Sequence, residues 1–267
     1  MAIATLASFK NSLIRQREFV AQTYGSQTSA AARFYDLFLV APNFVSPSTA
    51  INPTSATDGA IKFTNPSSGQ LSLVGLRAST TACGVYIFAD RLSHQGGLSG
   101  LVTGAQTTNL PTASLTRFTS GEGVMIGLTI YAIVGSVATT ITVSYTNSAG
   151  VAGRTTQSVA FGATGNREAS RILILPLQDG DTGARSVESV SIVASTGTAG
   201  NFGVILFKPL IAVAIDSTDS ENNAIGFLNG ASAGGIPTIP NDACIFPISM
   251  NLGGSLQSAF SFQLTEN

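Results

Sequence analysis

The chain has 267 residues and a mass of 27.3 kDa, and it contains 28 glycines and no tryptophan. Only 10% of its residues are charged, whereas about 25% is usual in globular domains, and 44% are hydrophobic. This composition excludes a chain that is disordered because of its charge. A net charge of −1 gives little attraction for phosphate groups, so sequence-specific nucleic-acid binding is not expected.

Residues 1–60 are predicted to form an amphipathic helix and an extended arm. Charged residues interrupt the first apolar run early, which is not typical of a signal peptide. A second short helix is expected over Ala30–Leu39, before a segment that contains four prolines. The apolar stripe of the first helix either packs on its own domain or docks on a partner subunit. Its members recur at steps of three, four or seven: Ile3, Leu6, Phe9, Leu13, Val20 and Tyr24.

Residues 61–215 are predicted to form an antiparallel β-sandwich of jelly-roll type, so the fold class is mainly β. Short β-branched and aromatic runs alternate here with Gly, Asn, Asp and Ser clusters. The turn at 147–150 indicates a hairpin, and no apolar run is long enough to span a membrane. The expected strands are Lys62–Thr64, Leu71–Leu76, Gly84–Ala89, Gly123–Ile133, Thr139–Tyr145, Thr155–Phe161, Arg171–Leu177, Ser186–Ala194, Gly203–Phe207 and Leu210–Ile215.

Residues 216–267 are predicted to form an acidic loop followed by two late strands, Ala243–Met250 and Leu256–Leu264. These strands either complete the domain or extend a neighbouring sheet. Charge is unevenly distributed along the chain. Residues 1–33, the head, have four basic residues and Glu18, a net charge of +3. The residues after Lys208, the tail, have five acidic residues and no basic one, a net charge of −5. Head-to-tail contacts between copies and solvated ends explain this equally well. The basic head comprises Lys10, Arg15, Arg17 and Arg33, and the acidic tail comprises Asp216, Asp219, Glu221, Asp242 and Glu266.

Three short patterns that suggest catalysis lack the context that catalysis requires. His94 is the only histidine, and its neighbours Ser93 and Asp90 in the sequence give no reason for triad geometry. Residues 181–183 spell the Asp-Thr-Gly of aspartic proteases without a second copy, and residues 230–234 match G-x-S-x-G with no histidine downstream. We therefore expect no enzyme activity.

No cofactor and no metal site is expected either; the alternative is an irregular Ca²⁺ site at Asp216, Asp219 and Glu221, for which a solvated acidic loop is the default interpretation. Cys83 and Cys244 have no Cys or His at zinc-ligand spacing, and buried reduced thiols are the expected state. Four residues are predicted to lie in exposed loops that could contact a binding partner: His94, Asn147, Asp179 and Asp181.

The middle of the chain, over about residues 83–208, resembles proteins encoded among the structural genes of tailed bacteriophages. The resemblance implies a virion context and transfers no catalytic residue. It is carried by Asp90-Arg91-Leu92 with Gly96-Gly97-Leu98-Ser99, Tyr145-Thr146-Asn147 with Gly150, Gly153-Arg154-Thr155, Pro176-Leu177-Gln178 with Gly180-Asp181-Thr182-Gly183, Arg185-Ser186-Val187, and Thr196-Gly197-Thr198-Ala199-Gly200-Asn201-Phe202-Gly203-Val204.

Composition and resemblance together predict a non-enzymatic virion protein that is assembled in the host cytoplasm. The expected role is head-associated, either decoration of the capsid or a collar at the head–tail junction. The expected partners are further copies of the chain and other virion proteins such as capsid, portal or neck proteins. The alternative is a receptor-binding module of a tail fibre or spike, in which loops 93–100 and 147–153 would contact a host glycan. The lack of tryptophan argues against this alternative.

Overall fold

The structure is a computed structural model that describes residues 16–110, 115–215, 222–223, 237–251 and 253–266. It is almost entirely β, and every ladder between the described strands is antiparallel, which confirms the predicted fold class. The elements are β1 (Gln16–Ser29), β2 (Phe34–Asp36), the 3-10 helix η1 (Leu37–Val40), β3 (Leu71–Thr80), β4 (Gly84–Leu98), β5 (Gln106–Leu110), β6 (Met125–Ala132), β7 (Thr139–Asn147), β8 (Arg154–Thr155), β9 (Val159–Phe161), β10 (Ile172–Leu175), β11 (Ala184–Ile192), β12 (Asn201–Ile215), β13 (Asn222–Asn223), β14 (Thr238–Ile239), β15 (Ile245–Asn251) and β16 (Gly254–Glu266).

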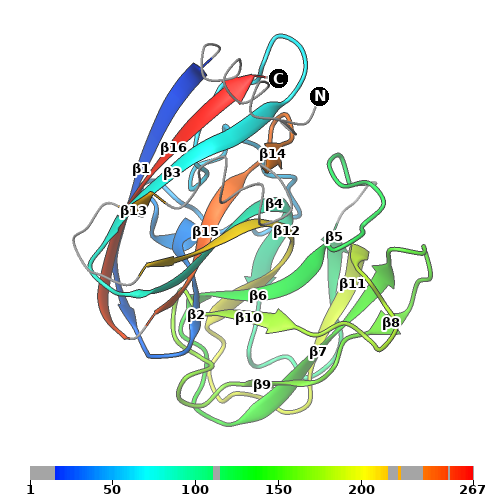
Figure 1. Cartoon of the computed structure of the whole chain (residues 1–267). Coiled ribbons are helices and arrows are strands. Elements are labelled where there is room, and N and C mark those ends of the chain that lie inside the picture. Colours follow the sequence, from blue (N-terminus) through cyan, green and yellow to red (C-terminus); the bar gives the residue numbers. More distant parts are fainter. Residues whose placement is uncertain (1–15, 111–114, 216–221, 224–236, 252, 267) are drawn as a thin grey trace.

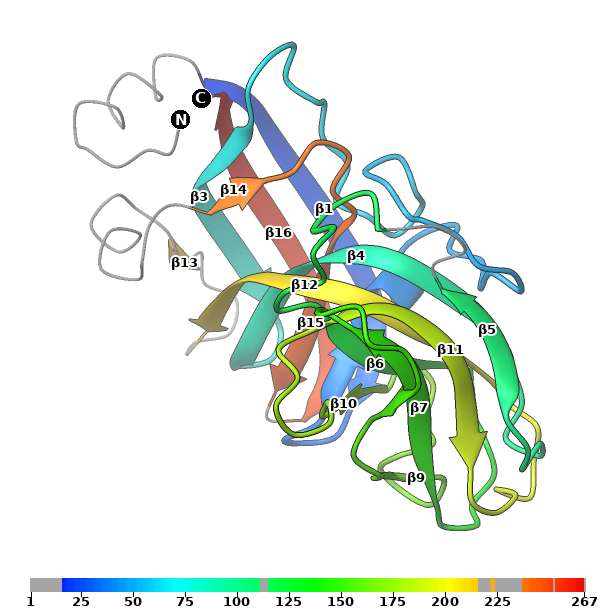
Figure 2. The same ribbon diagram turned by 90° about the vertical axis from the view of Figure 1, so that its right-hand side faces the viewer.

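A central sheet, here called sheet B, has the strand order β10-β6-β12-β4-β15-β2. Its strands β4 and β12 have 15 residues each and run side by side through the molecule, as Figure 2 shows. The sequence predicts two strands where β12 is one, because Pro209 follows closely after the first apolar run. One register shift lies just before Phe207 and another just after Pro209. They accommodate the proline while β12 stays paired with β4.

Two smaller sheets pack against opposite halves of sheet B (Figure 1). Sheet A has the order β1-β16-β3-β13, with β14 also on β3, and sheet C has the order β5-β11-β7-β8, with β9 also on β7. Phe88, Phe260 and Phe262 lie in the core between sheets A and B, and Leu128 and Val143 lie in the core between sheets C and B. Each long strand of sheet B thus contributes to both cores.

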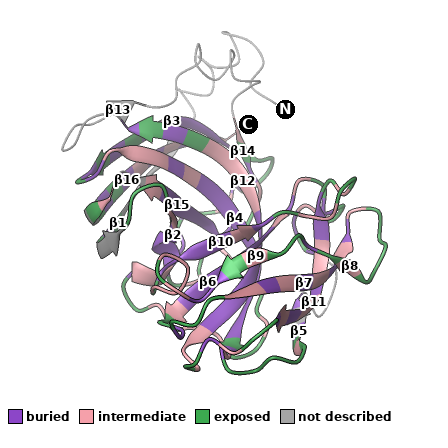
Figure 3. Cartoon of the chain, turned by 90° about the horizontal axis from the view of Figure 1, so that it is seen from below, coloured by how far each residue is buried: buried purple, intermediate pink, exposed green. Residues whose placement is uncertain are grey.

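The other face of sheet B is covered by η1 and the segments around it. Phe38 from η1 packs there with Phe207 and Phe246 in a third buried cluster. Figure 3 shows the result, with buried residues along the central strands and exposed residues concentrated in the loops. Because sheet B is covered on both faces, most side chains on β4 are buried, whichever way they point.

The predicted N-terminal helices are wrong in the part that the structure describes. Residues 16–29 form the strand β1, which pairs with β16 from Gln16↔Thr265 to Ser29↔Gly254. Of the predicted helical stripe, Val20 and Tyr24 therefore lie on a strand, and Ile3, Leu6, Phe9 and Leu13 lie outside the described residues. The second helix is replaced by β2 and the short η1, because β2 pairs with β15 in sheet B. Pairing with distant strands overrides the local periodicity here.

The remaining predictions agree more closely with the structure. The hairpin at 147–150 is confirmed: the Gly150 N–H donates to the Asn147 carbonyl, and β7 pairs with both β8 and β9. The two late strands are confirmed as β15 and β16, which complete sheets B and A of the same chain. The expected strand at 62–64 is absent from the described strands, where Ile61 makes only an isolated bridge to Ile245. No helix in the described residues is long and apolar enough to cross a membrane.

Candidate functional site

His94 lies inside the molecule, so the prediction of an exposed loop histidine is wrong. It is fully buried on β4, which continues through the glycines of residues 96–97 to Leu98. Gly96 serves close packing here, because its N–H donates to the Pro47 carbonyl at 2.6 Å and a Cβ would lie 2.7 Å from the Tyr131 ring. The glycines that suggested a loop let two segments approach the strand instead.

Beside His94, a buried ion pair joins β4 to β2. The Arg91 guanidinium donates a short hydrogen bond to Asp36 Oδ2, and both side chains have no exposed surface. Asp36 Oδ1 also accepts the Phe38 N–H at 3.1 Å, and Asp36 Oδ2 accepts the Thr129 hydroxyl at 3.0 Å. The Arg91 Cζ lies 4.1 Å from the ring centroid of Phe38 and 4.2 Å from that of Phe246. The cation is held by one carboxylate and two aromatic faces.

The hydrogen bonds of His94 define its tautomer. Arg91 Nη1 lies 3.3 Å from His94 Nδ1, and a guanidinium can only donate, so Nδ1 accepts and Nε2 carries the proton. His94 Nε2 makes a short hydrogen bond with the Tyr131 hydroxyl. Burial lowers the pKa of His94 well below its usual value, and the neighbouring Arg91 charge lowers it further. The imidazole is therefore neutral at pH 7.

A second buried ion pair lies one residue away on β4. Arg117 donates to both carboxylate oxygens of Asp90, at 2.8 and 2.9 Å, and the Cys244 N–H donates to Asp90 Oδ1 at 2.8 Å. Arg117 Nη2 also donates to the carbonyls of Pro53 and Arg91. Burial raises the pKa of Asp90, and the hydrogen bonds from Arg117 oppose that rise. This network ties the segment before β6 and the residue that precedes β15 to β4.

These buried groups are arranged for structural roles. Asp90, Arg91 and His94 have no exposed surface; Arg91 bonds to Asp36 and His94, whereas Asp90 bonds to Arg117. Ser93 is also buried and donates weakly toward the Ile51 carbonyl at 3.4 Å, not toward His94. A nucleophile and base that act on a substrate need contact with it and with each other. Ser93, His94 and Asp90 each bond to a different partner and form no hydrogen-bonded chain with one another.

The thiols and carboxylates show no metal-ligand arrangement within the described ranges, where no group of three or more His, Cys, Asp and Glu comes together. Cys244 is buried and Cys83 is half-buried, and neither forms a disulfide. Burial raises the pKa of the Cys244 thiol. A buried thiol that remains protonated is inert.

Asp181 organises a second polar cluster, between the hairpin turn and the turn before β11. Its carboxylate accepts hydrogen bonds from Tyr145 Oη at 2.5 Å, Asn147 Nδ2 at 2.7 Å and Arg154 Nε at 2.9 Å. These hydrogen bonds, that from Arg154 above all, lower the pKa of Asp181 to about 2. Asn147 is buried within this cluster, so its predicted exposure is wrong, whereas Asp179 is exposed as expected. Asp181 is half-buried, and its carboxylate is occupied within the fold.

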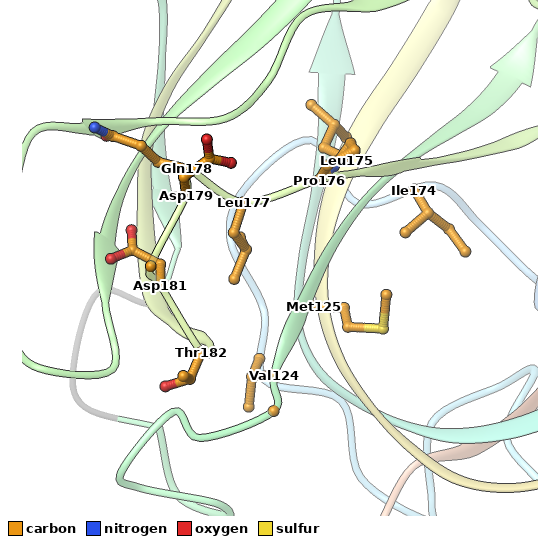
Figure 4. A pocket seen from close by; sticks show the side chains of 12 residues that line it. Val124, Met125, Ile174, Leu175, Pro176, Leu177, Gln178, Asp179, Asp181 and Thr182 are labelled. Atoms are coloured by element: carbon orange, nitrogen blue, oxygen red, sulfur yellow. The ribbon is translucent and has the colours of Figure 1, made fainter.

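A groove of about 650 Å³ lies next to this cluster. Figure 4 shows Met125 and Ile174 on one side, Leu177 between, and Asp181 and Thr182 on the other. The groove borders β10, which is an edge strand of sheet B. It combines an apolar floor with a polar rim.

The predicted charged ends fall mostly outside the described part of the chain. Lys10, Arg15, Asp216, Asp219 and Glu221 lie outside the described residues, and Arg17 lies on β1. The side chains of three members can be placed: Arg33 Nη1 donates to Asn166 Oδ1 at 3.5 Å, the exposed Asp242 accepts the Asn65 amide at 2.6 Å, and Glu266 at the end of β16 accepts the Ser68 N–H at 3.4 Å. These three side chains contact polar groups of the same chain.

Sequence reasoning missed the buried network around β4. The one available signal was Asp90 next to Arg91 in an otherwise apolar run, because adjacent opposite charges on a strand point to opposite faces. Each therefore needs its own partner when both faces are covered. The partners Asp36 and Arg117 are far away in sequence, and no local pattern identifies them.

No protein-family model matches the chain, and no curated protein matches it. Among solved structures, the chain has a likeness to the VP2 subviral particle of infectious bursal disease virus. The two are 10% identical, the match covers 94% of this chain and 81% of that chain, and the TM-score is 0.20. The structure of the Gt strain of the same virus is matched at 9% identity over 94% of this chain and 82% of that chain, with a TM-score of 0.16. TM-scores of this size lie below those of proteins that share a fold.

Proposed function

We propose that the protein is a non-enzymatic structural subunit of a tailed-bacteriophage virion. It assembles with further copies of itself and with capsid, portal or neck proteins, and its place is on the head, as a decoration or collar protein. It is assembled in the host cytoplasm and ends in the virion. The resemblance of residues 83–208 to phage structural proteins supplies the context, and the geometry of sheet A supplies the mode of assembly.

The observation that carries the proposal is the position of β1. Among the strands that the structure describes, this 14-residue strand is the terminal strand of sheet A, and β16 is its one ladder partner. A long edge strand presents a row of backbone donors and acceptors that a strand of another chain can pair with. Repeated over many copies, such pairing gives a stable assembly from modest individual contacts.

The use of the charged groups supports a structural role. Asp36, Asp90, Arg91 and Arg117 neutralise one another in the interior. The Asp181 carboxylate likewise accepts hydrogen bonds from three donors of its own chain. These groups hold strands and loops in place, so they are not available for a substrate.

The receptor-binding alternative requires exposed contact loops at residues 93–100 and 147–153. Residues 93–96 are buried on β4, and Asn147 is buried against Asp181, whereas residues 149–153 are exposed. The burial of residues 93–96 removes one of the two contact loops, and this favours the structural role over the alternative.

Purified particles test the proposal. Virions from an infected culture are separated from soluble lysate on a density gradient, and a tag at the C-terminus is located by electron microscopy. We expect the protein in the particle fraction, with the tag at fixed positions on the head or neck. Its absence from purified virions, or its presence only in the soluble fraction, would refute the proposal.

A further inference from the structure

Three loops meet at one end of sheets B and C, and Thr196 holds them together. The Thr196 hydroxyl accepts the Gly135 N–H at 3.0 Å and lies 3.1 Å from the Gly100 carbonyl. The Thr196 N–H donates to the Gly100 carbonyl at 2.8 Å, and the Thr196 carbonyl accepts the Val137 N–H at 3.0 Å. We call these loops, residues 99–104, 133–138 and 193–200, the tip.

Exposed apolar side chains gather at the tip. Among the described residues, eight large apolar side chains are exposed, and five of the eight are on the three tip loops: Leu101, Val102, Ile133, Val137 and Val193. Val193 is the most exposed of the five, at 77%. Single exposed apolar residues are ordinary on a protein surface, but a group on loops that contact one another marks an interaction surface.

The tip also has no charged residue. The three loops contain no Asp, Glu, Lys or Arg. At their border, the Arg167 carbonyl accepts the Val134 N–H at 3.2 Å. A centre without charge and a charged residue at the margin is the composition of a protein–protein interface.

The loops are held rigidly, as docking requires. A Cβ on Gly135 would lie 1.7 Å from the Thr196 carbonyl oxygen, and a Cβ on Gly200 would lie 2.6 Å from the Ile133 carbonyl oxygen. Backbone segments this close fix the relative positions of the loops. A preformed surface loses little conformational entropy when it binds.

We infer that the tip is a contact between two copies of this chain, related by a two-fold axis, with Val193 near its centre. In such a contact each surface patch meets the same patch of the other copy. A charged patch would there place like charges opposite each other, which is unfavourable, whereas the uncharged tip can meet itself. This inference rests on the proposed function and adds to it a surface that is separate from β1.

Charge substitutions at Val193 test the contact. The full-length chain is compared with Val193→Asp and Val193→Lys by analytical ultracentrifugation over a range of concentrations. Each substitution places two like charges across the axis, so we expect self-association about tenfold or more weaker. An equimolar mixture of the two variants places opposite charges across the axis, and we expect it to associate like the unsubstituted chain.

Val151 supplies the matched control. It is 52% exposed in the turn after β7, whereas Val193 is 77% exposed and its N–H donates to the Thr140 carbonyl near the start of β7. Val151→Asp and Val151→Lys therefore add the same charges to an exposed valine at the opposite end of that strand. We expect both control variants to self-associate like the unsubstituted chain.

Several results would overturn the inference. These are an unsubstituted chain that stays monomeric at about 100 μM, Val193 variants that associate normally, or weakened variants that do not recover when mixed. Binding of a monomeric chain to phosphatidylcholine vesicles, abolished by Val193→Asp, would assign the tip to a lipid surface and would also overturn it. The proposed function fails on a different result, the absence of the protein from purified virions.

Discussion

Lowering the pH from 7 to 5 is expected to destabilise the fold through His94. Its Nδ1 accepts a hydrogen bond from Arg91, so a proton added there would face a donor and a positive charge. The other groups around the ring offer no compensating acceptor: Tyr131 occupies Nε2, and the rings of Phe38 and Phe44 pack nearby. The carboxylate of Asp36 is already bound to Arg91.

The magnitude follows from proton linkage. In the unfolded chain His94 has a pKa of about 6.5, whereas burial and Arg91 lower its pKa well below that in the fold. Below pH 6.5 the unfolded state therefore binds a proton that the native state does not. The free energy of unfolding falls by up to about 1.4 kcal/mol per pH unit, or about 2 kcal/mol between pH 7 and pH 5.

Urea denaturation followed by circular dichroism measures this loss at pH 5, 6 and 7. His94→Gln is the control, because an amide can accept from Arg91 and does not titrate. His94 is the only histidine, and other groups, including Asp90, contribute equally to both proteins. We expect the stability difference between the two proteins to shrink by about 2 kcal/mol toward pH 5. A difference that is independent of pH would refute the neutral, buried histidine.

Three further predictions concern packing and charge. Arg91→Met leaves Asp36 as an unpaired buried charge, so it should lower the free energy of unfolding by about 3–5 kcal/mol in urea denaturation. Adding Asp36→Asn to this variant should recover much of that loss. Equal losses in the single and the double variant would contradict the ion pair. Gly135→Ala places a Cβ 1.7 Å from a backbone carbonyl oxygen, so it should lower the free energy of unfolding by about 1–3 kcal/mol or more. Gly104→Ala has no atom within 4 Å of its new Cβ and should leave the free energy of unfolding nearly unchanged in the same assay. Asp181 has a pKa of about 2, below its unfolded value, so its ionised form stabilises the fold above pH 4, and this contribution disappears as the pH falls toward 2. The melting temperature of Asp181→Asn should therefore fall less steeply between pH 4 and pH 2 than that of the unsubstituted chain. An equally steep fall in both proteins would count against the cluster.

The middle of the fold could be predicted from the sequence because its signals are local. Alternating Ile141, Val143 and Tyr145, followed by a turn that begins at Asn147 and ends at Gly150, predict a half-buried strand and its hairpin, and β7 has that form. The strand before it, predicted over 123–133, is β6, whereas the single strand predicted over 155–161 is divided into the short strands β8 and β9. In each case the side-chain alternation and the turn chemistry lead to the same result.

The N-terminal strand could not be predicted in this way. Val20 and Tyr24 are four residues apart, which fits one face of a helix, but the same two positions also lie on one face of a strand. The pairing of β1 with β16 joins residues about 240 apart in the chain, so the decisive contacts are non-local. Tyr24 shows the outcome, because it is buried in the core under sheet A with its hydroxyl donating to the Gly59 carbonyl at 3.2 Å.

The candidate site residues were misplaced for a related reason. Glycines around His94 suggested an exposed loop, yet they permit close packing against a covered strand. The motifs that carry the phage resemblance have internal roles: Arg91 pairs with Asp36, Asp181 joins two turns, and Thr196 joins the tip loops. Motif residues of this kind specify a framework, and the surfaces that it presents must be found from the structure.

The content of purified particles tests the central claim most directly. Quantitative mass spectrometry of gradient-purified virions compares the copy number of this chain with that of the major capsid protein. We predict a fixed ratio that is reproduced between preparations and persists through repeated gradients. A ratio that falls toward zero with each purification step would contradict a structural role in the virion.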